Sequence, residues 1–484
     1  DDQIGIDRRP DVVRQRRICV AFLECVELPI FEIAQSRCEP LADQGLPDWA
    51  QTAVDLHRWL SDPRPSHPVA TPSLGEVAGP GLPAWVDPAQ PWRFYPGFRA
   101  WMARAHDLIR RWLADSAAPV ATSAAHDLVI TLARRLLTLA GPRLMAAAEQ
   151  RENTDPLFHI DPAADWLKLW TEYPVLARVM AVAWRQWREA TIELLERMGA
   201  DLPMLEPGAS ITGLHSGQGD LHGSGRGVVK VITDRGGQWY LKPRASGTHR
   251  ALSALFARLD AVGEPLGLRL PDTVERPGYC WVRHIEREPS ANPAEVEQFF
   301  FRAGALLRIL QAVGATDLHH ENFIPVRDQP VLIDLETVFG LGSMDGADWA
   351  TPSGSVADAL IAEQLADTPS ATSMVTSVID GPPGTASVDI GALAGPTDRL
   401  TPYVVQELAL TDAGPRLRMS RISLITGSAL PTLRDSVVPV DEYAHAVIAG
   451  YAEVQRRLCA LPSLGLAESA RDAQVRFVAR PTQI

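Results

Sequence analysis

The spacing of apolar positions predicts that the first part of the chain is mostly helical. Over residues 165–200, apolar side chains recur at helical spacing, and the pattern predicts a second helix that Pro174 opens and Gly199 ends. The Trp side chains of this segment are expected to lie in a core. Residues 62–97 are rich in Pro and Gly and predict a long surface connection.

From about residue 205 the pattern changes, and strands are predicted. The stretch GVVKVITDRGGQWYLKP, residues 227–243, predicts a β-hairpin because two apolar runs flank an Asp-Arg-Gly-Gly turn. GYCWVRHIE, residues 278–286, predicts a further strand. PVLIDLETVF, residues 330–339, predicts a buried strand that runs into a polar tip.

Two more helices and an irregular segment are predicted in this second part. The apolar face of one helix consists of Val296, Phe299, Phe300, Ala303, Leu307 and Leu310. Gly314 ends that helix, and residues 440–461 predict another amphipathic helix. Residues 340–400 are rich in Gly, Ser, Ala and Pro and predict loops, whereas residues 475–484 predict a strand-like tail.

Composition narrows the class of protein. A net charge of −13 argues against a nucleic-acid partner, because such a protein needs a basic face. The five Cys residues form no CxxC pair, which favours a reducing compartment over a disulfide framework. No apolar run reaches the ~18 residues of a membrane span, and the first residues lack the apolar core of a signal peptide. We therefore expect a cytoplasmic protein.

The stretch GATDLHHENF, residues 314–323, has the spacing of a phosphoryl-transfer loop. Asn322 follows Asp317 by five residues, and Asp334 follows twelve residues later. In such sites one Asp orients or deprotonates the acceptor hydroxyl, the Asn binds a metal, and the later Asp binds Mg²⁺. Glu336, on the same face of the predicted strand as Asp334, is a further candidate ligand.

Two alternatives exist for this stretch taken alone. The first is a polar turn between a helix and a strand. The second is a zinc site built from His319, His320 and Glu321, which is disfavoured because adjacent His side chains point apart and no HExxH motif is present.

Two features upstream complete a candidate nucleotide site. Lys242, one of three Lys among 46 basic residues, stands on a predicted strand where it would hold the α- and β-phosphates; a surface Lys is the alternative. SGQGDLHGSGRG, residues 216–227, contains five glycines, of which Gly223 and Gly225 are predicted to let the backbone approach phosphates. Asp220 and His222 are unusual in a loop whose sole role is to bind phosphates.

These motifs resemble the dehydratase domain of class II lanthipeptide synthetases (LanM). The resemblance runs in order through GDLHGSGRGVVKV, WYLKPR, GATDLHHENF and VLIDLETVF, and reaches RFVARPT at the end. It implies an α+β fold with a lipid-kinase-like bilobal core, a β-rich N-lobe, a helical C-lobe, and additional mostly helical N-terminal and inserted segments. The predicted domains are a helical region at 1–204, a kinase-like core at 205–345 and a region carrying the elimination motif at 346–484.

The resemblance also implies a reaction. ATP, with Mg²⁺, would phosphorylate Ser and Thr of a ribosomally made precursor peptide that carries a leader, and elimination of phosphate would leave dehydroalanine and dehydrobutyrine. The implied site residues are Lys242 for the phosphates, Asp317 and His319 in the catalytic loop, Asn322, Asp334 and Glu336 for Mg²⁺, Asp220 and His222 in the Gly-rich loop, and Arg476 and Thr482 for elimination.

The sequence departs from the family pattern at its end. Full-length members continue into a zinc-dependent cyclase domain, whereas this sequence stops soon after Thr482 and has no later Cys/His zinc set. We therefore expect no Zn²⁺ and no ring formation by this chain, with a cyclase domain of the full-length protein as a partner. A small-molecule or lipid kinase with the same ATP site is the alternative function, and a non-enzymatic nucleotide-binding module is a third.

Overall fold

The structure is a computed structural model that mixes helices and sheets, so the predicted α+β class is confirmed. It describes residues 51–56, 98–115, 119–149, 166–217, 225–339, 374–464 and 473, with short gaps inside the fourth, fifth and sixth ranges. The predicted connection at 62–97 and the predicted tail at 475–484 lie outside the described residues, as does most of 340–400.

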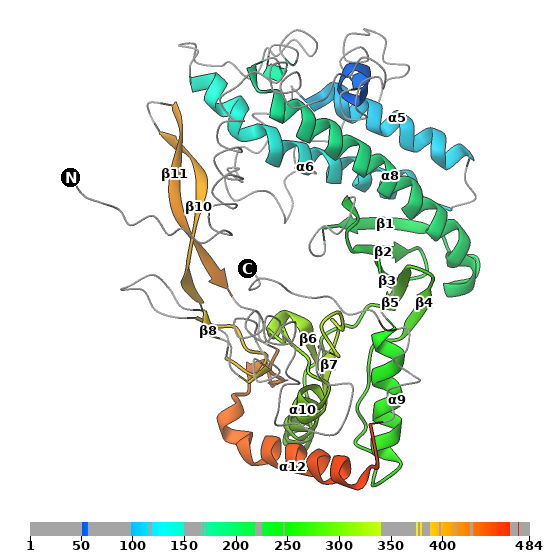
Figure 1. Cartoon of the computed structure of the whole chain (residues 1–484), viewed down its shortest axis with the longest axis vertical. Helices are drawn as coiled ribbons and strands as arrows, with labels where there is room; N and C mark the ends of the chain where they lie inside the picture. The colour runs from blue at the N-terminus through cyan, green and yellow to red at the C-terminus, as the bar shows by residue number, and fades with distance from the viewer. Residues whose placement is uncertain are drawn as a thin grey trace, which may run out of the picture. The chain divides into compact units, whose positions relative to one another are not determined.

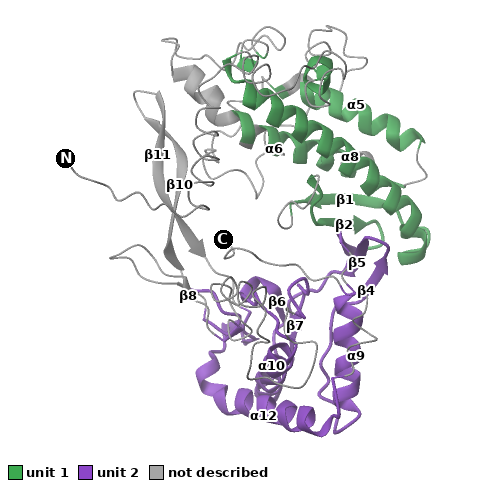
Figure 2. Ribbon diagram, viewed as in Figure 1, with its two compact units in different colours: residues 1–237, 407–418 green, residues 238–406, 419–484 purple. Residues whose placement is uncertain are grey.

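The chain divides into two compact units (Figure 2). Unit 1 comprises residues 1–237 and 407–418, and unit 2 comprises residues 238–406 and 419–484. The lipid-kinase-like lobes and the domain boundaries at 204 and 345 stay predictions. None of the helices in the described part of the chain is both long and apolar enough to cross a membrane.

Unit 1 is built on three long helices (Figure 1), and a cluster of tryptophan side chains lies in its core. The helices are α5 (Arg99–Asp115), α6 (Thr122–Glu149) and α8 (Pro174–Leu205). Trp101 packs against the rings of Trp166, Trp170 and Trp184, with ring centroids 5.6 to 5.9 Å apart. All four side chains are buried, so the prediction that the Trp residues belong to a core is confirmed.

Helix α8 begins at Pro174 as predicted, but the prediction that Gly199 ends it is wrong. The helix continues to Leu205 and takes in Pro203 near its end. A helical Gly costs about 1 kcal/mol relative to Ala. Burial of Met198 before it and Leu202 after it offsets that cost, because each buried side chain of this size contributes about 2 kcal/mol.

Two strands of unit 1 follow α8. β1 (Ile211–Ser216) pairs antiparallel with β2 (Val229–Thr233). The other edge of β1 is also covered, because Ile211 exchanges backbone hydrogen bonds of 2.7 and 2.8 Å with Pro119 and Ala121. The backbone N–H of Leu214 donates to the carboxylate of Asp127 on α6 at 2.8 Å. These contacts join the strands to the helical part of the unit.

Unit 2 begins with three antiparallel strands in the order β3, β5, β4. β3 (Gln238–Lys242) pairs with β5 (Tyr279–Arg283), and β5 pairs with β4 (Thr273–Arg276). β2, β3 and β5 form where strands were predicted, whereas β4 was not predicted. Its four residues are all half-buried and carry no alternation of polarity, so the pattern of the sequence held no strand signal there.

Helix α10 (Pro293–Ala312) is the centre of unit 2. Asn292 caps its start by accepting from the Glu295 N–H at 3.1 Å, and Glu295 in return accepts from the N–H of Ala291 at 2.9 Å. The predicted apolar face is buried, and so are Gly304, Ala305, Leu306, Ile309 and Ala312. The helix is therefore covered on more sides than the one face predicted.

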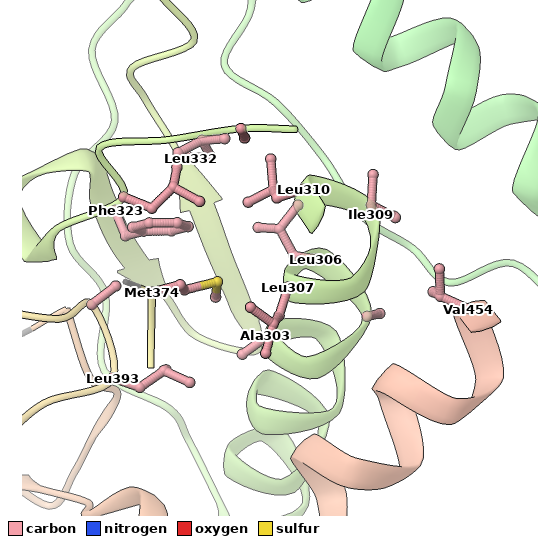
Figure 3. Close-up of a cluster of buried hydrophobic side chains, with 14 of the residues drawn as sticks. Ala303, Leu306, Leu307, Ile309, Leu310, Phe323, Leu332, Met374, Leu393 and Val454 are labelled. Carbon is pink, nitrogen blue, oxygen red and sulfur yellow. The ribbon is translucent and has the colours of Figure 1, made fainter. Parts of the chain in front are cut away.

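The core of unit 2 forms where α10 meets the hairpin of β6 (Phe323–Val326) and β7 (Gln329–Leu332). Figure 3 shows Leu306 and Leu310 of α10 facing Phe323 and Leu332 of that hairpin. α12 (Ala444–Ala460) packs on another side of α10 and contributes Val454. This packing holds the start of β6 and the end of β7 against the C-terminal end of α10.

The remaining elements complete unit 2 and the segments around it. They are α9 (Thr248–Asp260), η4 (His320–Asn322), β8 (Val378–Ile379), β9 (Val388–Asp389), β10 (Asp398–Thr411), β11 (Gly414–Ile425), β12 (Thr432–Leu433), β13 (Ser436–Val437) and η6 (Val440–Tyr443). η6 and α12 confirm the predicted helix at 440–461. The paired β10 and β11 were not predicted.

Candidate active site

The candidate catalytic loop starts where α10 ends. Gly314 has φ +63, and the hydrogen bonds Ala315 N–H to Leu310 O (2.9 Å) and Gly314 N–H to Gln311 O (3.1 Å) close a Schellman motif. Three residues later, Asp317 has φ +57, a left-handed conformation that costs a non-glycine residue on the order of 1 kcal/mol. Asp tolerates this conformation better than most residues.

Asn322 closes the loop on itself. Its side-chain Nδ2 donates to the backbone oxygen of Asp317 at 2.6 Å, and its backbone N–H donates to His319 O at 3.0 Å. His319 is the N-cap of η4, and its Nδ1 accepts from the Glu321 N–H at 3.4 Å. With the amide nitrogen of Asn322 bound to Asp317, its Oδ1 is the atom that remains for a ligand.

The backbone of Ile333 joins the catalytic loop to the rest of the site. Its N–H donates to Asn322 O at 2.9 Å, and its carbonyl accepts from Lys242 Nζ at 2.9 Å. Asp334 is the next residue in the chain. The backbone of this one residue therefore brings together Lys242 of β3, Asn322 of the candidate catalytic loop and Asp334, although Lys242 and Ile333 are 91 residues apart.

The prediction that Asp334 and Glu336 share a face of one strand is wrong. β7 ends at Leu332, so both residues lie in the turn that follows it. Asp334 Oδ1 accepts from the Glu336 N–H at 3.1 Å, which folds the turn back on the Asp side chain. The strand ends here because Ile333 uses its N–H on Asn322 and its carbonyl on Lys242 rather than on a neighbouring strand.

The charged groups around Lys242 affect the pKa of the Cys280 thiol. Cys280 is the cross-strand partner of Lys242 and is buried, with its thiol 3.4 Å from Arg244 O. Burial raises the pKa of this thiol to about 11; the Lys242 ammonium opposes the rise, and the carboxylates of Glu275, Glu336 and Asp334 add to it. The cation and the two acidic groups of the site are therefore close enough to act on one buried atom.

A pair of threonines ties the two loops of the site together. Thr337 Oγ1 donates to Thr316 O at 2.6 Å, and Thr316 N–H donates to Thr337 O at 3.3 Å. Thr316 precedes Asp317, and Thr337 follows Glu336. The two bonds therefore fix the distance between the loop that carries Asp317 and the turn that carries the candidate metal ligands.

Thr337→Val is expected to lower the free energy of unfolding by about 1–3 kcal/mol, because it removes the donor to Thr316 O while keeping the shape of the side chain. Thr337→Ser keeps the hydroxyl and is the matched control, with a smaller expected loss. Urea unfolding of the three proteins measures the difference. If the Val variant is as stable as the wild type, the hydroxyl does not hold the two loops together.

His320 contacts a segment of the chain that is distant in the sequence. It is buried, its N–H donates to Ile390 O at 3.0 Å, and its Nδ1 lies 3.2 Å from the same oxygen. Burial lowers the pKa of His320 below its ordinary value, and the Ile390 carbonyl and Glu321 oppose that shift. A neutral His320 therefore anchors Ile390 to the catalytic loop, a contact that the sequence pattern did not indicate.

His320 is expected to make the fold sensitive to acid. Its pKa is lowered on folding, so the unfolded chain takes up the proton first, and stability falls as pH drops through about 6.5 towards the lower folded value. His320→Gln keeps an N–H donor but does not titrate, so it should lose less stability over this range. Urea unfolding at several pH values tests this, with the same change at His445, an exposed residue of α12, as the control. Equal acid sensitivity of His320→Gln and wild type would contradict the assignment.

The donor set of the site fits Mg²⁺. Asn322 Oδ1 and the Asp334 and Glu336 carboxylates are oxygen ligands, which this hard cation prefers. Across the described ranges, no group of three or more His, Cys, Asp or Glu side chains is gathered for a metal. Mg²⁺ in phosphoryl-transfer sites takes one or two carboxylates and completes its shell with phosphates and water, so Asp334 and Glu336 with Asn322 are sufficient.

Five of the predicted site residues lie outside the described residues: Asp220, His222, Gly223, Arg476 and Thr482. Gly225 is described and has φ +77. A Cβ at this position would lie 2.7 Å from Arg135 Nη1 and 2.9 Å from Gln186 Cβ, so helices α6 and α8 of unit 1 leave room for glycine alone.

Comparisons with known proteins place the chain in a family. Residues 173–484 match a family model described as "Domain of unknown function (DUF4135)", a range that starts at the first turn of α8 and includes every predicted site residue. A curated relative, the "Lacticin 481/lactococcin biosynthesis protein LcnDR2" of Lactococcus lactis subsp. lactis, is 26% identical over 159 residues. That alignment covers 31% of this chain and 17% of the relative, so the chain matches less than a fifth of that protein's length. Because the family match spans more than half of its residues, the chain belongs to the DUF4135 family.

Proposed function

We propose that this chain dehydrates Ser and Thr side chains of a ribosomally made precursor peptide, first by ATP-dependent phosphorylation and then by elimination of phosphate. The observation that carries the proposal is the backbone of Ile333, whose N–H and carbonyl bind Asn322 and Lys242 next to Asp334. The ordered motifs that resemble LanM dehydratase domains support it. Membership of DUF4135 and the partial similarity to a protein named for lacticin 481/lactococcin biosynthesis support a role in lanthipeptide modification.

In the phosphorylation step, Asp317 orients the peptide hydroxyl and accepts its proton as the oxygen attacks the γ-phosphorus of ATP. A new P–O bond forms to the peptide, the bond to ADP breaks, and Lys242 holds the α- and β-phosphates in place. Lys242 is itself positioned by the Ile333 carbonyl. Asn322 and Asp334, with Glu336, would hold Mg²⁺, which would supply positive charge to neutralise the phosphates.

In the elimination step, a base removes the Cα proton, the Cα–Cβ double bond forms, and the Cβ–O bond breaks to release phosphate. Arg476 is proposed to bind the departing phosphate through its guanidinium, with Thr482 contributing a hydroxyl. Asp220 and His222 of the Gly-rich loop are proposed to act in the same site. These four assignments follow the resemblance of the motifs.

The resemblance of the motifs also leads us to propose the substrate class. The partner is a precursor peptide with a leader, and a cyclase domain of a longer protein would act on the dehydrated product. A small-molecule or lipid kinase would use the same Lys242, Asp317 and Asp334 but would not require Arg476 or Thr482.

The test is incubation of the purified chain with ATP, Mg²⁺ and a Ser/Thr-rich precursor peptide, followed by mass spectrometry, with ATP omitted as the control. Loss of one water per modified residue is the expected result. Gain of a phosphoryl group without loss of water would reduce the function to that of a peptide kinase. Phosphate transferred to metabolites or lipids, with peptides untouched, would overturn the proposal in favour of the alternative.

A further inference from the structure

A row of three side chains crosses the strands of unit 2 at Lys242. Lys242 of β3 pairs with Cys280 of β5, and Cys280 pairs in turn with Glu275 of β4. Residues that lie directly opposite one another on paired strands point to the same face of a sheet. Glu275 therefore lies on the face that carries the Lys242 side chain, two strands away from it.

The side chain in the middle of the row is short, so the outer two can approach each other above it. Neighbouring strands lie about 4.8 Å apart, which separates the backbones of Lys242 and Glu275 by about 10 Å. Lys and Glu carry their charges at the ends of long side chains, whereas Cys280 ends at a buried sulfur. Besides burial, which raises the pKa of that thiol to about 11, the Lys242 ammonium and the Glu275 carboxylate act on it in opposite directions. The row therefore places a cation and a carboxylate on either side of one uncharged group.

Helix α9, which follows β3, does not supply a carboxylate for Lys242. In protein kinases, a Glu on a helix forms an ion pair with the Lys of the third strand, which holds the phosphates. The only acidic residue of α9 is Asp260, at the end of the helix, and its Oδ1 accepts from the Leu266 N–H at 2.8 Å. An acidic partner of Lys242 must therefore come from another element.

Glu275 has no part in the proposed Mg²⁺ site. Asp334 and Glu336 also act on the Cys280 thiol, but the proposed function uses both of them for the cation. Glu275 forms an ion pair with Arg250 of α9 at 3.7 Å, and the Arg250 side chain is 61% exposed, so solvent weakens this pair. The Glu275 carboxylate thus stays available to the ammonium in its own row.

We propose that Glu275 is a positioning residue for Lys242, because its carboxylate attracts the ammonium and orders it for the phosphates of ATP. This role rests on the proposed function, since it requires Lys242 to hold ATP. The ammonium has three N–H donors, of which one goes to the Ile333 carbonyl at 2.9 Å. With the carbonyl and the carboxylate as two fixed acceptors, a donor is left for the phosphates, and the lysine loses less freedom when ATP binds.

The test measures the Kd for ATP, in the presence of Mg²⁺, on the purified full chain by isothermal titration calorimetry. Glu275→Gln is expected to raise this Kd about threefold to thirtyfold, because Lys242 loses the group that orders it. Charge repulsion alone predicts the opposite sign, since removal of a carboxylate near the phosphates would tighten binding. A Kd equal to or below that of the wild type would overturn the proposal.

Lys242→Met shows whether the effect passes through the lysine. In that background there is no ammonium to order, so adding Glu275→Gln should leave the Kd for ATP unchanged or lower it. A further rise of the same size as in the wild type would mean that Glu275 supports the strands and not the lysine.

Arg250→Gln separates this role from a structural tie between α9 and β4. It removes the other partner of Glu275 and leaves Lys242 and Glu275 in place, so the Kd for ATP should stay within about twofold of the wild type. Glu264→Gln removes the same charge as Glu275→Gln at an exposed residue just after α9, and it should also stay within that range. If Arg250→Gln weakens ATP binding as much as Glu275→Gln does, the ion pair with α9 explains the effect and the proposal is overturned.

The failure of this inference is distinguishable from failure of the proposed function. If the wild-type chain binds no ATP, the proposed function fails. If the wild type binds ATP and Glu275→Gln binds it equally well, only the role of Glu275 is overturned.

Discussion

Replacing Asp317 by Asn is expected to slow phosphorylation of the peptide by about a hundredfold to ten-thousandfold, because the amide cannot accept the proton of the substrate hydroxyl. The fold should survive the change. Asp317 has φ +57, and Asn adopts the left-handed conformation at least as readily as Asp. The bond from Asn322 goes to the backbone oxygen of residue 317, which the substitution does not remove.

The measurement is the rate of phosphate transfer from ATP to the peptide, followed by mass spectrometry. Asp435→Asn is the matched control: it makes the same change at an exposed residue with φ +66, in the turn between β12 and β13. It should leave the rate unchanged. A rate for Asp317→Asn close to that of the control would remove Asp317 from the proposed role.

A variant of Thr482 provides a comparison with Asp317→Asn. Thr482→Ala is expected to leave phosphorylation intact and to let phosphopeptide accumulate, because Thr482 is assigned to elimination. Asp317→Asn should show little phosphopeptide and little dehydrated product. Equal loss of both half-reactions in the two variants would contradict the division of the site into two steps.

Gly450→Ala is expected to destabilise unit 2 by about 2 kcal/mol or more, against the usual gain of about 1 kcal/mol for Gly→Ala inside a helix. A Cβ at Gly450 of α12 would lie 1.8 Å from the backbone oxygen of Phe301 on α10. Backbone atoms of two packed helices cannot move aside as a side chain can. The helices must separate, and the core contacts between them, such as those of Val454, would be lost.

A glycine of α10, Gly304, approaches the backbone of α12 just as closely. A Cβ at Gly304 of α10 would lie 1.9 Å from the Val447 oxygen on α12. Gly304→Ala should therefore cost a similar amount, and the double variant should cost less than the sum, because one separation accommodates both methyl groups. Urea unfolding measures these changes. Gly395→Ala is the control, since nothing lies within 4 Å of its added Cβ, and an equally stable Gly450→Ala would refute the argument.

The close crossing of α10 and α12 was not predictable from either helix alone. The periodicity of residues 440–461 and the apolar face of α10 correctly indicated two amphipathic helices. A helical Gly in a sequence pattern is usually a weakness, and only the partner helix shows that Gly304 and Gly450 allow backbones to meet. Gly199 illustrates the opposite error, because it was predicted to end α8. The helix continues past Gly199 because residues on both sides of it are buried.

The sequence by itself indicated the candidate site residues and their order: Lys242, then Asp317 and Asn322, then Asp334. Local spacing was enough for this. The loop from Asp317 to Asn322 and the short strand before Asp334 form from residues that are neighbours in the sequence. It also determined the α+β class and most helices, since their apolar periodicity is a local property.

Only the tertiary structure decided how these residues meet. The bonds from Lys242 and Asn322 to Ile333, the threonine pair and the contact of His320 with Ile390 join segments far apart in the chain. The structure also placed Asp334 and Glu336 in a turn rather than on a strand. The physical reason is that a backbone N–H or carbonyl has the same character at every position, so its long-range partner leaves no mark in the pattern of side chains.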